Sequence, residues 1–265
     1  MKKFLLNVLT NNIIPFVGKL RLCDNKFCNI IYYHDIVRDE GYSYMRMPVQ
    51  QFKEQMLWIA ENGYETLRFD DFQDEEKLKF KKKRVLIAFD DGWLSNYTEI
   101  FDFMKEHNIK YNVYLTMGEI GKNPDYLTWE MVKEMHRSGL VGFGAHTYTH
   151  PSMKDLSLVD CDLEITKANE LFRENLGFYP LDFCYPFGYY SEDSNKYMVN
   201  NTDYARIYTS DMSMSYKLGH KIIFSRNGIS KDYNFSLFQK VVKGYNNTYK
   251  DIFPVLLRLK KIISR

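Results

Sequence analysis

The 265-residue chain has few cysteines, almost no net charge and no long apolar run, and each absence excludes a class of protein. Its four cysteines, Cys23, Cys28, Cys161 and Cys184, form no CxxC pair, so the sequence predicts neither a zinc ribbon nor a thioredoxin-type redox motif. Lysine and arginine (36) nearly balance aspartate and glutamate (34), which argues against a dedicated nucleic-acid binder. No apolar segment approaches the roughly 18 residues that a membrane span needs.

The composition is that of a folded domain. Apolar residues make up 45% of the chain and charged residues 26%, which excludes disorder for most of it. Aromatic residues reach 16%, enough to fill a large core and still line a groove with rings. We expect one domain over residues 29–245, acting as a monomer and without a nucleic-acid partner.

The two ends of the chain differ from the middle. The segment from Met1 to Leu6 begins like a signal peptide, but Asn7 interrupts it and no small-residue cleavage site follows. We therefore interpret residues 1–28 as an amphipathic leader and residues 246–265 as a basic amphipathic tail. Each could lie on a membrane surface or pack on the domain. Without a convincing signal peptide, the expected location is the cytoplasm or the membrane periphery.

Short apolar runs alternate with segments of helical periodicity about seven times. This alternation is typical of an α/β fold with a parallel sheet, and so many units favour closure into a deformed (β/α) barrel with about seven strands and outer helices. The expected strands are 29–33, 85–89, 111–116, 141–145, 182–185, 204–208 and 222–224. The expected helices are 49–62, 97–107, 129–138, 158–175, 191–200 and 235–245.

Three polar or turn-forming clusters directly follow predicted strands: Phe89-Asp90-Asp91-Gly92, His146-Thr147-Tyr148-Thr149-His150 and Cys184-Tyr185-Pro186-Phe187-Gly188. In a barrel of parallel strands, these strand ends lie at one face, where active sites are found.

Histidines and carboxylates in these clusters suggest a metal site. His146 and His150 are four residues apart, so one helical turn would place both imidazoles on one side. Adding one carboxylate of the first cluster gives two histidines and one aspartate. Three protein ligands with an open position are typical of a catalytic divalent metal, most often zinc. The alternatives are a simple Asp-Asp-Gly turn and two structural histidines.

The three clusters, in this order, resemble the polysaccharide deacetylases of carbohydrate esterase family 4. The similarity runs from about Ile30 to about Gly228. The opening Tyr32-Tyr33-His34-Asp35-Ile36 is similar to the branch that includes poly-N-acetylglucosamine deacetylases. The resemblance implies that Asp91, His146 and His150 bind one divalent metal ion, with zinc the first choice and cobalt, nickel and iron as alternatives.

The resemblance also implies roles around the metal. Asp90 would be the general base, and the backbone N–H of Phe187 would stabilise the oxyanion. Tyr185 is a further candidate for substrate contact, because it lies beside the third motif. The substrate would be an acetylated glycan or glycolipid, and the products a free amine on the sugar and acetate.

Two departures from the family pattern concern positions near the base and the acid. Many members begin the third motif with an arginine that orients the base, but Cys184 stands there, so we expect Arg226 to replace it. The family's late leucine-x-histidine motif has no clean copy. His34 is the preferred general acid, with His220 as the alternative. These departures keep open the hypothesis of a catalytically impaired glycan-binding barrel. A third hypothesis is an amidohydrolase acting on a small non-sugar amide, which a closed pocket would favour and a long groove would oppose.

Overall fold

The computed structural model describes residues 27–38, 43, 45–73, 77, 79, 83–211 and 215–244. The expected leader over residues 1–28 lies outside this part except for Phe27 and Cys28, and the expected tail over 246–265 lies outside it entirely. Among the described helices, none combines the length and the apolar character that crossing a bilayer requires.

Strands and helices alternate along the described chain. The strands are β1 (Asn29–Tyr33), β2 (Asp35–Val37), β3 (Arg46–Pro48), β4 (Glu65–Leu67), β5 (Arg84–Phe89), β6 (Tyr111–Leu115), β7 (Val141–Ala145), β8 (Asp182–Cys184), β9 (Arg206–Thr209), β10 (Tyr216–Leu218), β11 (Lys221–Ser225) and β12 (Asn227–Gly228). The α-helices are α3 (Val49–Glu61), α5 (Ser95–Thr98), α6 (Phe101–Glu106), α7 (Trp129–Arg137), α8 (Leu158–Leu176), α9 (Glu192–Asn201) and α10 (Phe235–Val242). Two 3-10 helices are η2 (Phe69–Gln73) and η3 (Pro186–Gly188).

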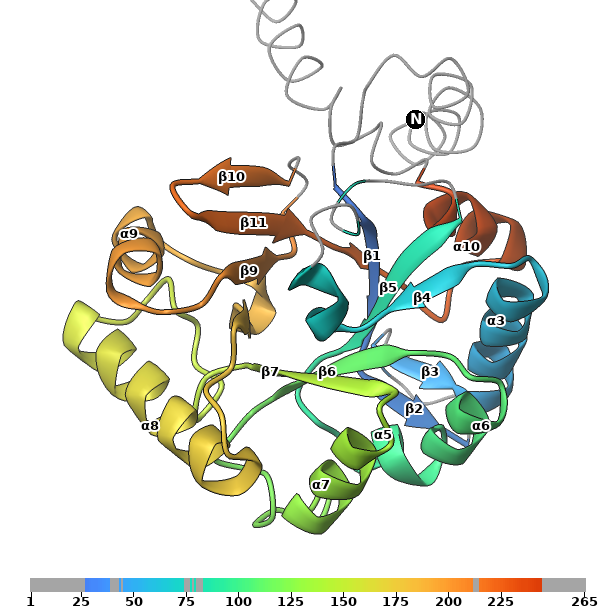
Figure 1. Cartoon of the computed structure of the whole chain (residues 1–265), viewed down its shortest axis with the longest axis horizontal. Helices are drawn as coiled ribbons and strands as arrows, with labels where there is room; N and C mark the ends of the chain where they lie inside the picture. The colour runs from blue at the N-terminus through green and yellow to red at the C-terminus, as the bar shows by residue number, and fades with distance from the viewer. Residues whose placement is uncertain are drawn as a thin grey trace, which may run out of the picture.

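One ten-stranded sheet forms the centre of the molecule. Its order is β10-β11-β9-β8-β7-β6-β5-β1-β12, β4 adds to β5, and every pair except β10 with β11 is parallel. Only Arg226 separates β11 from β12, so this one segment contributes strands near both ends of the strand order. The strands curve into a ring with helices outside it (Figure 1), which confirms the expected (β/α) barrel.

The central strands are apolar throughout because both of their faces are buried. In β5, Val85, Ile87 and Phe89 pack in the cluster that also contains the buried apolar residues of α3. Leu86 and Ala88, on the opposite face, pack in a second cluster inside the barrel. Because these strands run parallel, their last residues lie at one end of the barrel.

The barrel interior is filled by aromatic side chains from β4–η2, the segment 65–73. Phe69 lies 5.1 Å from Tyr114 and Phe72 stacks 5.7 Å from Phe224, measured between ring centroids. The short helix η2 is therefore seen near the centre of the ring in Figure 1. Because side chains occupy the interior, the barrel is a packed core and carries its cleft at one end.

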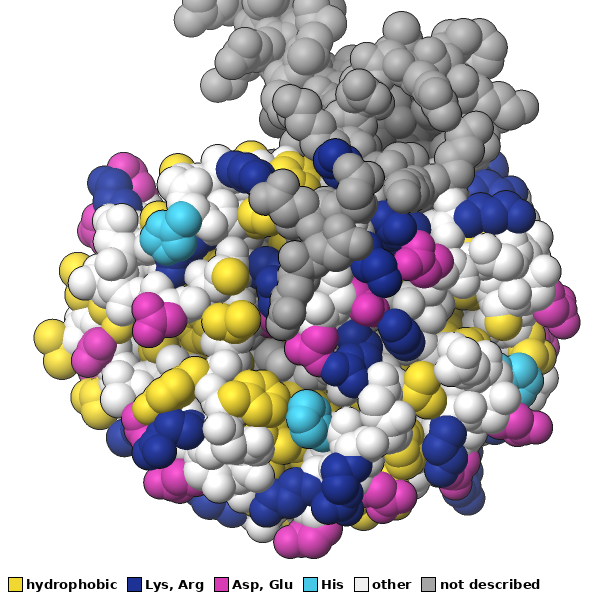
Figure 2. Space-filling model, viewed as in Figure 1, with side chains coloured by type: hydrophobic (Ala, Val, Ile, Leu, Met, Phe, Trp, Pro, Cys, Tyr) yellow, Lys and Arg dark blue, Asp and Glu magenta, His cyan; other side chains and the backbone are white. Residues whose placement is uncertain are grey.

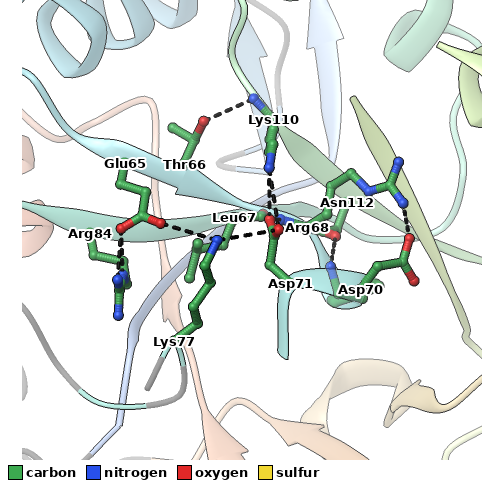
Figure 3. Close-up of polar contacts among 11 residues, drawn as sticks. Glu65, Thr66, Leu67, Arg68, Asp70, Asp71, Lys77, Arg84, Lys110 and Asn112 are labelled. Carbon is green, nitrogen blue, oxygen red and sulfur yellow. Dashed lines mark hydrogen bonds and ion pairs between the residues drawn. The ribbon is translucent and has the colours of Figure 1, made fainter. Parts of the chain in front are cut away.

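Polar contacts fix this segment to the neighbouring strands (Figure 3). The buried Asn112 side chain donates to the carbonyls of Leu67 and Ile87 and accepts from the Phe69 N–H. Asp71 accepts from Lys110 Nζ at 3.0 Å, which ties η2 to the start of β6. On the face shown in Figure 2, basic and acidic side chains are interspersed, in keeping with the small net charge.

The structure differs from the sequence expectations in its smallest elements. Strands β2, β3, β4 and β10 were not expected, and each has only three residues, too few to show a periodicity. The helix expected over 97–107 is two helices, α5 and α6. The backbone leaves the helical conformation at Ile100, where φ is −126°.

Candidate active site

The three motifs meet at one end of the barrel, as the strand order requires. Asp90 and Asp91 follow β5, His146 follows β7, and the third motif follows β8. They border a cleft of about 550 Å³. The cleft is lined by Tyr32, His34, Asp35, Ser43, Met45, Arg46, Asp90, Asp91, Trp93, His146, His150, Phe187, Gly188, Tyr189, Ser210, Gly228, Ile229, Ser230 and Tyr233.

The turn after β5 separates its two carboxylates. Asp91 and Gly92 both have positive φ, 74° and 87°. A Cβ at Gly92 would come within 3.0 Å of the Leu115 and Ile120 side chains, so only glycine fits there without displacement. The sharp turn sends adjacent carboxylates to different partners, which removes the repulsion expected for two neighbouring charges.

The turn after β7 brings the two imidazoles together, but it is not helical. Thr147 and His150 have φ values of 65° and 61°, and the His150 N–H donates to Thr147 Oγ1 at 3.0 Å. The ring centroids of His146 and His150 are 4.8 Å apart. The expected proximity is therefore present, while the helical turn given as its reason is wrong.

Asp91, His146 and His150 have donor atoms that converge. Asp91 Oδ1 lies 3.5 Å from His146 Nε2 and 3.1 Å from His150 Nε2. Asp91 Oδ1 and His146 Nε2 are buried, and neither makes a hydrogen bond to any described residue. Two buried polar atoms without partners, facing one point beside a second imidazole, fit a divalent metal ion.

Hydrogen bonds orient these side chains. His146 Nδ1 lies 2.7 Å from the Cys184 carbonyl oxygen, which can only accept, so Nδ1 carries the proton and Nε2 keeps its lone pair. Asp91 Oδ2 accepts from Trp93 Nε1 at 2.9 Å. Asp91 is thus anchored through one oxygen, and its other oxygen, Oδ1, is left to face the two imidazoles.

Asp90 is buried and paired with Arg226. Arg226 Nη1 donates to Asp90 Oδ1 at 2.6 Å and Nη2 donates to Oδ2 at 2.9 Å. Burial raises the pKa of Asp90, but the guanidinium charge and its hydrogen bonds outweigh burial and lower the pKa. The structure therefore brings Arg226 to the position that sequence analysis expected, in place of the arginine that the third motif lacks.

Aromatic rings fix the Arg226 guanidinium. Its centre lies 4.1 Å from the Tyr32 ring and 5.3 Å from the Tyr114 ring, within the range of cation–π contacts. A Cβ at Gly228 would lie 3.0 Å from the Tyr32 ring, so a larger residue at this position would crowd the ring that contacts Arg226. Cys184 is fully buried and contributes its carbonyl to His146.

The two candidate acids lie in different places. His34 lines the cleft, and its Nε2 is 3.8 Å from Asp90 Oδ2. Burial lowers the pKa of His34 and outweighs the opposite effects of Asp90 and Asp91. His220 is exposed in the turn between β10 and β11 and does not line the cleft. Only His34 is brought to the other site residues.

The third motif places its two aromatic candidates differently. Phe187 is 58% exposed, and its ring centroid lies 4.6 Å from that of His150. Tyr185 is fully buried, stacks on Tyr190 and donates its hydroxyl to Asn195. Its side chain packs outside the barrel with Phe183, so the expectation that it contacts substrate is wrong for the ring.

Two residues of the cleft that sequence analysis missed contact the charged side chains of the site. Trp93 anchors Asp91, and its position two residues after that ligand was the available signal. Tyr32 covers the guanidinium of Arg226, a contact that depends on the chain returning at β12 and leaves no local pattern.

Comparison with known sequences confirms the resemblance drawn from the motifs. Residues 77–206 match the family model described as polysaccharide deacetylase. YxkH of Bacillus subtilis (strain 168), whose name assigns it to the polysaccharide deacetylases, is 30% identical over 169 residues, covering 63% of this chain and 59% of that protein. The poly-beta-1,6-N-acetyl-D-glucosamine N-deacetylase of Staphylococcus epidermidis is 28% identical over 165 residues, covering 57% of each. The matches thus span less than two thirds of both relatives.

Solved structures share the fold. A Streptococcus pyogenes deacetylase, PplD, determined in complex with acetate, superposes with a TM-score of 0.72 at 19% identity, covering 82% of this chain and 98% of that one. IcaB from Ammonifex degensii superposes with a TM-score of 0.69 at 20% identity, covering 83% and 97%. At these identities the likeness concerns the fold.

Proposed function

We propose that this chain, which belongs to the polysaccharide deacetylase family, is a metal-dependent hydrolase that removes N-acetyl groups from N-acetylhexosamine units of a polysaccharide or glycolipid. The observation that carries the proposal is that a candidate metal site and a candidate general base lie side by side in one cleft. Asp91, His146 and His150 converge on one point, and the Arg226-bound Asp90 lies beside them. The name of the staphylococcal relative supports an N-acetylglucosamine polymer as the substrate.

Asp91, His146 and His150 would hold the metal. One carboxylate and two neutral imidazoles suit zinc, and also cobalt, nickel or iron. A bound divalent ion supplies Lewis-acid activation of a water molecule and of the amide carbonyl. Trp93 and the Cys184 carbonyl support the proposal, since they orient two of the three ligands.

Asp90 would accept the proton that the attacking water loses. Each carboxylate oxygen has two acceptor positions, so the two hydrogen bonds from Arg226 leave room for a proton. Arg226 keeps the carboxylate ionised and fixed in direction before the reaction. The attack forms the new C–O bond to the acetyl carbon, and the backbone N–H of Phe187 would donate to the developing oxyanion.

His34 would pass a proton to the leaving nitrogen. Because burial lowers its pKa, the imidazole is neutral at neutral pH and must gain a proton during the cycle. Asp90 Oδ2, 3.8 Å from His34 Nε2, is the nearby source. Breaking the C–N bond then yields the free amine of the sugar and acetate, so the water proton received by Asp90 ends on the nitrogen.

The shape of the cleft supports a glycan more than a small amide. Phe187 and Tyr189 are exposed at its edge, 58% and 60%, and their ring planes are inclined by 29° with centroids 6.3 Å apart. Exposed rings offer apolar faces on which sugars stack. An enclosed pocket would have favoured a small substrate.

The test is Asp90→Asn in the zinc-loaded protein, assayed by acetate release from acetylated β-1,6-linked glucosamine oligomers. We expect zinc to remain bound and acetate release to fall by about 10²- to 10⁴-fold, the usual contribution of a general base. Asp125→Asn, at an exposed position, is the matched control and should leave both unchanged. Undiminished turnover in Asp90→Asn would refute the base assignment. Tight oligomer binding by the wild type without acetate release would instead favour a glycan-binding barrel.

A further inference from the structure

We infer that Glu164, on α8, is a positioning residue that sets the affinity of the His146–His150 turn for its metal ion. The inference rests on the proposed function, because it concerns the same metal site. Glu164 lies outside the three motifs and does not line the cleft, so it would act through the turn alone.

Glu164 binds the turn from outside at three points. Its Oε2 accepts from the backbone N–H of Tyr148 at 2.9 Å and from that of Thr149 at 2.8 Å. Its Oε1 accepts from Thr149 Oγ1 at 2.7 Å. Every one of these donors belongs to a residue between the two imidazoles, so one carboxylate holds the segment that sets their separation.

The turn needs such support because its backbone is strained at both ends. Thr147 and His150 are non-glycine residues with positive φ. Each such position costs on the order of 1 to 3 kcal/mol and persists only where surrounding contacts hold it. Without an external acceptor, the N–H groups of Tyr148 and Thr149 would turn toward water, and the two imidazoles would lose their fixed separation.

The inner side of the turn is held by the loop after β6. Met117 N–H donates to the Thr147 carbonyl at 3.1 Å and Gly118 N–H donates to the Tyr148 carbonyl at 2.7 Å. The turn is thus clamped between this loop and Glu164. The two clamps are complementary, since the loop takes the carbonyls of the turn and Glu164 takes its N–H groups.

Helix α8 is a firm support for the carboxylate. Ser157 caps its first turn by accepting from the Asp160 N–H, and Cys161, Ile165 and Ala168 bury one face of it. Glu164 lies between two of these buried positions, so its backbone is fixed by the packing. A rigid element that orients metal ligands through hydrogen bonds typically affects metal affinity by about 10- to 100-fold.

The experiment measures zinc affinity of the full chain by competition with a coloured chelator, together with the absorption spectrum of the cobalt(II) form. We expect Glu164→Ala to bind zinc about 10- to 100-fold more weakly and to change the cobalt spectrum. Glu164→Gln should be intermediate, because its amide oxygen can still accept from the two N–H groups but its NH₂ cannot accept from the Thr149 hydroxyl.

Glu170→Ala is the matched control on the same helix. Glu170 also accepts three hydrogen bonds, two from Arg173 and one from Tyr179, but it does not contact the turn. Its loss removes hydrogen bonds from the same helix at an exposed position and should leave zinc affinity unchanged. If Glu164→Ala does not fold, Glu164→Gln carries the comparison.

Two results would overturn the inference, and they differ. Wild-type zinc affinity and a wild-type cobalt spectrum in the Glu164 variants would remove the role of Glu164 and leave the proposed function standing. A wild-type chain that binds neither zinc nor cobalt would remove the metal site itself, and the inference with it.

Discussion

Arg226 and Asp90 are 136 positions apart in the sequence and form a buried, two-point ion pair beside the candidate metal ligands. The chain contains a second buried two-point pair, in which Arg206 binds side-on and donates from Nε and Nη2 to the two Asp182 oxygens at 2.6 and 2.7 Å. That pair does not line the cleft. The same chemistry thus holds a candidate base in one place and supports the barrel in the other, and substitutions can separate the two roles.

Arg226→Lys tests the role in catalysis. A lysine has one ammonium point charge and cannot make both bonds or lie flat on the Tyr32 ring, so the exchange is not conservative. We expect acetate release per folded, zinc-loaded molecule to fall about 10- to 100-fold with zinc still bound. Arg206→Lys should instead lower the free energy of unfolding, by up to about 3 to 5 kcal/mol, and leave turnover of the folded fraction unchanged. Equal turnover in both variants would contradict the assignment.

Single residues of the site differ in how far the sequence predicts them. Asp91, His146 and His150 directly follow apolar strands, and parallel strands end together, so their convergence follows from local patterns. Arg226 could be proposed only because Cys184 occupies the arginine position of the third motif. The direction of the Tyr185 ring depends on its packing against Phe183, which no local pattern records, and that prediction was wrong.

At the scale of elements, β4 and η2 form a unit that closes the barrel interior opposite the cleft. Phe69 and Phe72 pack in the core, whereas Asp71 is partly exposed and binds polar groups of neighbouring segments. Asp71 accepts from the Arg68 N–H at 2.9 Å and from Lys110 Nζ at 3.0 Å (Figure 3). Burial raises the pKa of Asp71, but these contacts outweigh it, and the pKa lies below its ordinary value of 3.8.

This shift predicts a pH-dependent contribution to stability. A lowered pKa in the folded state means that the unfolded chain binds the proton more tightly. The contribution of Asp71 is therefore complete well above pH 3.8 and is lost as pH falls through the lower, folded-state value. We expect Asp71→Asn to reduce the free energy of unfolding at pH 7 by about 1 kcal/mol, since solvent screens a partly exposed carboxylate. Urea unfolding at several pH values measures this difference, which should shrink below about pH 4.

Asp70→Asn is the control at the neighbouring position. Asp70 pairs with the Arg68 side chain and is more exposed than Asp71, so its loss should change stability little at any pH. A difference between wild type and Asp71→Asn that stays constant from pH 7 to pH 3 would show that the ionised carboxylate is not the cause.

The elements also differ in how well the sequence predicts them. Helix α8 and strand β5 have long periodic or fully apolar patterns, and both lie within a residue of their predicted bounds. The three-residue strands β2, β3 and β4 exist because a neighbour supplies their hydrogen bonds, so the pairing that defines them is tertiary. For the same reason the non-helical turn of His146 to His150 was predicted as helical: its conformation depends on Glu164 and the loop after β6.

At the scale of the whole molecule, the candidate site joins distant parts of the barrel. His34 follows β1, Asp90 and Asp91 follow β5, the two histidines follow β7, and Arg226 stands between β11 and β12. The ion pair between Arg226 and Asp90 therefore connects the β11–β12 segment to the end of β5. That segment contributes strands near both ends of the strand order, and β5 lies next to β1. Metal binding at this site should then be coupled to unfolding of the barrel as a unit, because an unfolded chain cannot bring Asp91 to the histidines.

Zinc should accordingly raise the temperature of thermal unfolding. At a free concentration of about 100 times the dissociation constant, a ligand specific for the folded state adds about 2.7 kcal/mol, which corresponds to roughly 5 to 11 °C for a domain of this size. Calorimetry with and without zinc measures the shift. His150→Ala removes one ligand and should abolish most of it, whereas His220→Ala, at the exposed turn between β10 and β11, should keep it whole. A shift that survives in His150→Ala and disappears in His220→Ala would place the metal elsewhere, since His150 faces Asp91 and His220 does not line the cleft.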